Sequence, residues 1–134
     1  MQVPLLDLHP QHEGLRDEII AAVTDVIDST RYIMGPELER FEEAVAEYSG
    51  CKYALGVSSG TDALLLALMS LNIGPGDKVL VPDFSFFATA GVVSRLNAEP
   101  VFLEIDPKTF NLCPKCLEEK LESYTEEELA QVKA

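Results

Sequence analysis

The feature that most constrains the fold is an alternation of short apolar runs and helix-like segments between residues 53 and 121. The apolar runs, at 53–57, 78–82 and 100–105, are typical of buried strands. Helical patterns separate and follow them, at 63–71, 88–96 and 114–121. Because strands that are connected through helices run parallel, this order predicts an α/β fold with crossover helices.

Two further helices are predicted before the first strand. Apolar residues recur at helical spacing in the first of them, at Leu15, Ile19, Val23, Val26 and Ile27. The second is expected to begin at Pro36, whose missing N–H would be unpaired in a first turn anyway, and to end at Gly50. At the other end, Thr125 and Glu128 form a capping-box pattern, but a frayed, solvated tail is the preferred interpretation.

Charge and hydropathy narrow the possible partners. The net charge is −13 and the chain has only 10 Lys and Arg residues, which argues against a nucleic-acid partner. The longest apolar run, 63–69, is far shorter than the roughly 20 residues that a membrane helix needs. Asp7 lies where a signal peptide would carry positive charge. A cytoplasmic location is therefore expected, with no membrane association.

Cys113 and Cys116 form a C-x-x-C motif in a chain with three cysteines. A zinc site would need further ligands, and the remaining candidates, Cys51, His9 and His12, are distant in the sequence. A thioredoxin-like motif should open a helix directly after a buried strand, whereas a loop at 106–111 precedes this one. The preferred interpretation is two ordinary thiols near a helix start, with no metal site; a small thiol or metal protein is the least favoured function.

A polar turn, residues 58–62, lies between the first predicted strand and its helix. The first turn of a helix presents unpaired N–H groups and a positive dipole end, which together attract a phosphate group. Gly60 allows close approach, and the hydroxyls of Ser59 and Thr61 are potential donors. Asp62 would repel a phosphate unless it capped the helix or pointed away. An ordinary helix cap without a ligand is the competing interpretation.

Two adjacent phenylalanines, Phe86 and Phe87, follow the next predicted strand at the same carboxyl edge of the sheet. Open α/β sheets bind ligands at this edge, and an aromatic side chain there can stack on a flat heteroaromatic ring. Neighbouring residues of an extended segment face opposite ways. One of the two is therefore expected in the core and the other at the ligand.

Several motifs in this order resemble one family, the DegT/DnrJ/EryC1/StrS sugar aminotransferases of the aspartate-aminotransferase fold type. The matching motifs are PLLDL at 4–8, RYIMGP at 31–36, SGTDAL at 59–64, GPGD at 74–77, VP at 81–82, FFAT at 86–89 and DPKTFN at 106–111. The resemblance implies a pyridoxal-phosphate (PLP) enzyme that transfers an amino group, typically from glutamate, to a keto group of a nucleotide-linked sugar. Some members of the family are dehydratases instead.

The resemblance also implies roles for individual residues. Gly60, Thr61 and Asp62 match the turn that holds the cofactor phosphate, and Phe86 matches the aromatic that stacks on the pyridine ring. Arg31 and Tyr32 match a segment near the substrate entrance, at the interface of a homodimer. Residues 1–121 correspond to the amino-terminal part of the PLP-binding large domain, and residues 122–134 are a polar tail outside the resemblance.

No residue of this chain matches the family's Schiff-base lysine. Its six lysines are Lys52, Lys78, Lys108, Lys115, Lys120 and Lys133, and none lies in a family-like motif. No catalytic residue is therefore predicted here, and the chain is expected to be inactive alone. Without its neighbouring strands it is also expected to fold poorly or to associate through helix 63–71. The alternative function is a non-catalytic binding module that associates with a full-length relative.

Overall fold

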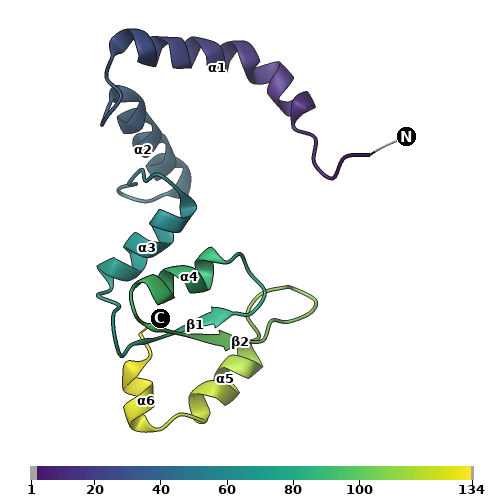
Figure 1. Ribbon diagram of the computed structural model, residues 1–134, viewed down its shortest axis with the longest axis vertical. Helices are drawn as coiled ribbons and strands as arrows, with labels where there is room; N and C mark the ends of the chain where they lie inside the picture. The colour runs from purple at the N-terminus through teal and green to yellow at the C-terminus, as the bar shows by residue number, and fades with distance from the viewer. Residues whose placement is uncertain (1–2, 134) are drawn as a thin grey trace. The chain divides into compact units, whose positions relative to one another are not determined.

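The computed structural model describes residues 3–133 and divides the chain into two compact units, Met1–Gly56 and Val57–Ala134 (Figure 1). Among the described residues, the first unit contains two helices. The second contains a parallel pair of strands and four helices. The predicted α/β class is confirmed, and the sheet belongs wholly to the second unit.

Helices α1 (His9–Ser29) and α2 (Pro36–Ser49) form the first unit. Pro36 occupies the first turn of α2, and Gly50 ends this helix in a left-handed conformation with φ 66°, both as predicted. The apolar stripe of α1 remains partly exposed: Leu15, Ile19, Val23 and Ile27 keep 43–54% of their surface. Although α1 is 21 residues long, no helix within residues 3–133 is both long and apolar enough to cross a membrane.

The predicted strand at 53–57 is wrong, because this segment is irregular in the structure. Tyr53 and Leu55 are each 77% exposed, and a 2.7 Å hydrogen bond from the Gly56 N–H to Glu42 Oε1 anchors the end of the segment. A strand exists only where its N–H and C=O groups pair with a neighbour. Among the described residues no strand lies beside this segment, so its apolar composition alone does not make it β.

Strands β1 (Lys78–Pro82) and β2 (Glu99–Leu103) pair in parallel, with Lys78 opposite Glu99 and Pro82 opposite Leu103. Helix α4 (Ala88–Arg95) connects them, and helix α3 (Gly60–Ser70) packs against α4. Side chains from β1, from α4 and from the flanking turns form a core cluster, namely Ile73, Val79, Val81, Val93 and Ala98. Ala88 and Val92 of α4 and Val101 and Leu103 of β2 are also buried. This small core fixes the carboxyl ends of both strands, where the candidate site lies.

The carboxyl-terminal segment is ordered, contrary to the expectation of a solvated tail. Helix α5 (Pro114–Glu122) is followed by α6 (Glu126–Gln131), which begins with a complete capping box between Thr125 and Glu128. Beyond α6 the backbone returns to the sheet. Val132 forms a parallel bridge with Lys78, and the Lys133 N–H donates to the Lys78 carbonyl at 3.1 Å. Pairing with β1 supplies the long-range contact that a polar local sequence could not reveal.

Helix α3 leaves much of its apolar surface uncovered, with Leu64, Leu66 and Met69 between 42% and 51% exposed. We expect the purified chain to self-associate through this face, so that its apparent mass in light scattering rises with concentration. Leu66→Glu places a charge in the face and is expected to shift the equilibrium toward monomer by about tenfold or more. Ser123→Glu adds the same charge at an exposed site outside α3 and should leave the association equilibrium unchanged. A monodisperse monomer at all concentrations would contradict this prediction.

Candidate functional site

The amino-terminal turn of α3 is open to a ligand. Ser59 is the N-cap, and its Oγ accepts the Asp62 N–H at 3.1 Å, while its carbonyl accepts the Ala63 N–H at 3.0 Å. Within residues 3–133, the N–H groups of Gly60 and Thr61 donate to no other protein atom. A Cβ built on Gly60 would meet nothing within 4 Å. Two backbone donors at the positive end of a helix thus remain accessible, which is the donor set that an anion needs.

The Asp62 carboxylate turns back onto the residues before the helix. It accepts hydrogen bonds from the hydroxyl of Ser58 and from that of Ser59, the latter at 3.1 Å. These two bonds, that of Ser58 first, hold the pKa of Asp62 below its usual value, so the group is ionised at neutral pH. The Ser59 hydroxyl, expected to donate to a phosphate, is therefore committed to the cap and to Asp62. Of the two hydroxyls predicted as donors, only that of Thr61 is left.

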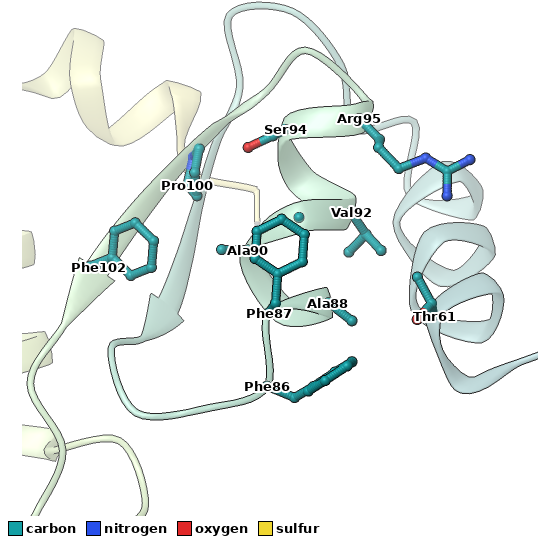
Figure 2. Close-up of a pocket in the computed structure, with 11 residues that line it drawn as sticks. Thr61, Phe86, Phe87, Ala88, Ala90, Val92, Ser94, Arg95, Pro100 and Phe102 are labelled. Atoms are coloured by element: carbon teal, nitrogen blue, oxygen red, sulfur yellow. The ribbon is translucent and has the colours of Figure 1, made fainter.

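Thr61 and Phe86 line the same cavity, of about 720 Å³ (Figure 2). Thr61 comes from the first turn of α3, and Phe86 from the segment between β1 and α4. The remaining wall is mostly apolar and runs along α4 toward β2; it consists of Phe87, Ala88, Ala90, Gly91, Val92, Ser94, Arg95, Pro100 and Phe102. The structure thus brings Thr61 of the predicted phosphate turn and the predicted stacking aromatic, Phe86, to one cavity, whereas Gly60 and Asp62 are not among the residues that line it.

The prediction that one of the two phenylalanines lies in the core and the other at the ligand is wrong. Phe86 and Phe87 are 78% and 82% exposed, and neither belongs to the core. Phe87 already has helical dihedrals, φ −48° and ψ −34°, so the alternation of an extended segment does not apply. Its ring lies against Gly91, where an added Cβ would stand 2.9 Å from a ring carbon. The core position is taken instead by Ala88, the next residue.

Arg95, in the last turn of α4, lines the cavity but was not singled out from the sequence. After the hydrogen bonds from Ser58 and Ser59, its charge also contributes to lowering the pKa of Asp62. A signal was available, because Arg95 is the only basic residue between Lys78 and Lys108. It adds positive charge to the α3–α4 face of the cavity.

Arg31 and Tyr32 belong to the other unit, Met1–Gly56, and are described within it. Both are exposed, and the Tyr32 hydroxyl donates to the Ile27 carbonyl at 3.3 Å. The turn that carries them requires Gly35, since a Cβ there would approach the Arg31 carbonyl oxygen to 2.6 Å. Their assignment to a substrate entrance stays a prediction.

No lysine within residues 3–133 lines the cavity. Lys78 begins β1, at the amino edge of the sheet, and its Nζ lies 2.6 Å from Glu99 Oε2. The hydrogen bond to Glu99 raises the pKa of Lys78, so its amine stays protonated. Lys52 and Lys120 lie over the rings of Tyr53 and Tyr124, at 5.0 and 4.8 Å. A protonated amine cannot act as a nucleophile.

The part of the chain that the structure describes holds no cluster of three or more His, Cys, Asp or Glu side chains able to bind a metal ion. Its three cysteines, Cys51, Cys113 and Cys116, are all free thiols.

The model of the DegT/DnrJ/EryC1/StrS aminotransferase family matches residues 13–132. This chain belongs to that family. The match runs through both units and includes α6.

Curated proteins and solved structures are similar to this chain over most of its length. It is 50% identical over 103 residues to a dTDP-3-amino-3,4,6-trideoxy-alpha-D-glucose transaminase of Streptomyces venezuelae, covering 77% of this chain and 27% of the relative. It is 41% identical over 116 residues to the UDP-2-acetamido-2-deoxy-3-oxo-D-glucuronate aminotransferase of Pseudomonas aeruginosa. This match covers 87% of this chain and 32% of the relative. The crystal structure of ntda from Bacillus subtilis, with bound cofactor PMP, superposes with a TM-score of 0.86 at 31% identity. This match covers 98% of this chain and 29% of the ntda chain. The chain spans about a third of the length of these relatives.

Proposed function

We propose that this chain supplies the phosphate-binding and ring-stacking part of a PLP-dependent aminotransferase that acts on a keto group of a nucleotide-linked sugar. The observation that carries the proposal is that Thr61 and Phe86 line one cavity, beside the open first turn of α3. The names of the two curated relatives, both nucleotide-sugar aminotransferases, support the substrate class.

Each residue of the turn has a distinct task in this proposal. The N–H groups of Gly60 and Thr61 and the Thr61 hydroxyl hold the phosphate, assisted by the dipole of the 11-residue helix α3. Asp62 is ionised, but its charge is held by the hydroxyls of Ser58 and Ser59, away from the open donors. It therefore orders the turn instead of contacting the anion.

Phe86 offers a flat apolar face beside this turn, which suits a pyridine ring whose phosphate is held at Gly60 and Thr61. When bound, the cofactor would supply an electron sink for the carbon that exchanges its amino group. The chain's own residues bind and orient the cofactor and keep water off one face of its ring.

In this proposal, the Schiff-base lysine of the enzyme is not among these 134 residues. A Schiff-base lysine would have to come from elsewhere, because no lysine of residues 3–133 lines the cavity. We propose further that the complete protein is a cytoplasmic homodimer using an amino donor such as glutamate. In it, Arg31 and Tyr32 would lie near the substrate. Residues 1–121 would be the amino-terminal part of its large domain.

The phosphate turn can be tested on the chain itself by adding inorganic phosphate or PLP and following backbone amide signals by NMR. We expect the largest shifts at Gly60 and Thr61. Gly60→Glu has room for its side chain, since nothing lies within 4 Å of a Cβ there, and a carboxylate in the first turn does not destabilise a helix. The introduced carboxylate competes with the bound anion for the same N–H donors, so the dissociation constant for phosphate or PLP should rise at least about tenfold.

The matched control is Ser70→Glu, which adds the same charge at the exposed last residue of α3. It is expected to leave anion affinity unchanged within about twofold, because the charge is screened at the far end of the helix. Equal weakening by both substitutions, or shifts that avoid the α3 turn, would argue against the phosphate site.

A further inference from the structure

Cys113 and Cys116 lie at the start of α5 and are joined by a hydrogen bond. Cys113 is the N-cap, with extended dihedrals of φ −73° and ψ 113°, and its Sγ accepts the Cys116 N–H at 3.3 Å. Pro114, between them, needs no partner for a backbone N–H. Both thiols are half-buried, whereas the third cysteine, Cys51, is exposed. The pair therefore lies at a helix start, and Cys51 provides an exposed comparison within the same chain.

The backbone anchors this turn to the end of β2. After the strand, Ile105 forms an antiparallel bridge with Leu112, and the Asp106 N–H donates to the Asn111 carbonyl at 2.8 Å. The Cys113 N–H then donates to the Glu104 carbonyl at 3.0 Å. The loop at 106–111 thus returns the chain to the strand it left. The objection from the sequence, that a loop separates the motif from a strand, does not hold in three dimensions.

The two thiols differ in their electrostatic setting. The hydrogen bond with the Cys116 side chain, followed by that from the Cys116 N–H, lowers the pKa of Cys113. The same thiol–thiol bond, with desolvation next, raises the pKa of Cys116 to about 11. One sulfur is favoured as a thiolate and its neighbour holds a proton, which is the division of roles between an attacking and a resolving cysteine.

We propose that Cys113 and Cys116 form a thiol–disulfide exchange pair that a low-molecular-weight disulfide, such as oxidised glutathione, converts reversibly to an intramolecular disulfide. The Cys113 thiolate attacks one glutathione sulfur, the glutathione S–S bond breaks, and one glutathione thiolate leaves. Cys116 then gives its proton to solvent, and its sulfur attacks Sγ of Cys113 and displaces the second glutathione. The two cysteines lose two electrons in total, and the glutathione disulfide gains them.

Closing this bond requires only a local movement. Side chains three residues apart on a helix have Cβ atoms about 5–6 Å apart, whereas a disulfide needs roughly 3.5–4.5 Å. Cys113 is the N-cap and lies outside the helical dihedrals, so its backbone can adjust without breaking α5. The proposal concerns residues 104–116 alone and is independent of the proposed cofactor site.

The test uses the intact, reduced chain at pH 7 with mixtures of reduced and oxidised glutathione. Samples are quenched with acid, alkylated and mapped by mass spectrometry. We expect the peptide with Cys113 and Cys116 to lose two hydrogens, while Cys51 forms only a glutathione adduct. The initial rate at Cys113 should exceed that at Cys51 at least about fivefold, and the ratio should fall toward one in urea.

Two variants separate the steps. Cys116→Ser should trap Cys113 as a stable mixed disulfide with glutathione. Cys113→Ser keeps an N-cap oxygen for α5, and Cys116 should then form only a glutathione adduct, more slowly than Cys113 reacts in the unsubstituted chain. The proposal is overturned if Cys113 and Cys51 react at equal rates in the folded chain, if urea leaves their ratio unchanged, or if Cys113 and Cys116 only carry separate adducts.

Discussion

Val93→Asp is expected to abolish the cooperative urea transition of the unit Val57–Ala134. Val93 is 1% exposed and belongs to the core formed with Val79, Val81, Ile73 and Ala98. An unpaired carboxylate in this position loses its hydration without gaining a partner, which costs more than about 4 kcal/mol. Because whole domains are stable by only about 5–15 kcal/mol, a core this small should not survive the change. Circular dichroism at 222 nm during urea titration is the measurement.

The control is Ser94→Asp, one residue further along α4. Ser94 is exposed, so the same carboxylate remains hydrated there and should change the free energy of unfolding by less than about 0.5 kcal/mol. If Val93→Asp retained the transition of the unsubstituted chain, Val93 would not be a core residue and the packing of α4 on the sheet would be wrong.

Borohydride treatment of the purified chain after incubation with PLP is expected to label no single lysine stoichiometrically. The side chain of Lys78 is only 15% exposed and forms a salt bridge with Glu99. The raised pKa of Lys78 keeps its amine protonated. A protonated amine does not attack a carbonyl. Peptide mapping should therefore show only low, scattered labelling of exposed lysines.

The comparison for this experiment is the same chain in urea, where all lysines are equally accessible. Scattered labelling should be similar in both conditions. Saturating label on one lysine of the folded chain, lost in urea, would show that this residue holds the catalytic position and that the assignment of the lysine to a region outside these residues is wrong.

Sequence patterns predicted the elements whose stability is local or whose partners are close in the chain. Strands β1 and β2 and the helix between them lie where apolar runs and turn residues placed them, within a residue or two. Pro36 and Gly50 bounded α2 correctly, because first-turn proline and left-handed glycine are local requirements. The polar turn at 58–62 does lie at a helix start, since Ser59 caps α3, but the helix begins at Gly60, three residues earlier than predicted.

Long-range pairing decided the predictions that failed. The run at 53–57 has a strand-like composition but no strand beside it among the described residues, and Val132 pairs with Lys78 despite a polar local sequence. The orientation of Phe86 and Phe87 depended on where α4 begins, which their own side chains do not determine. Arg95 entered the cavity only through the packing of α3 on α4.

The bridge between Val132 and Lys78 has a consequence for how the sheet can grow. Since β2 occupies one edge of β1, Val132 and Lys133 lie on the other edge and cover only its first residue. The amino end of that edge is thereby closed to an incoming foreign segment. A strand that added there in continuation of this bridge would have to run parallel to β1 in a fixed register, because a slip of one residue would turn its apolar side chains to the opposite face. Within residues 3–133 the rest of this edge, from Val79 to Pro82, has no partner, so residues 132–133 set the register in which a parallel strand could continue but leave most of the edge open.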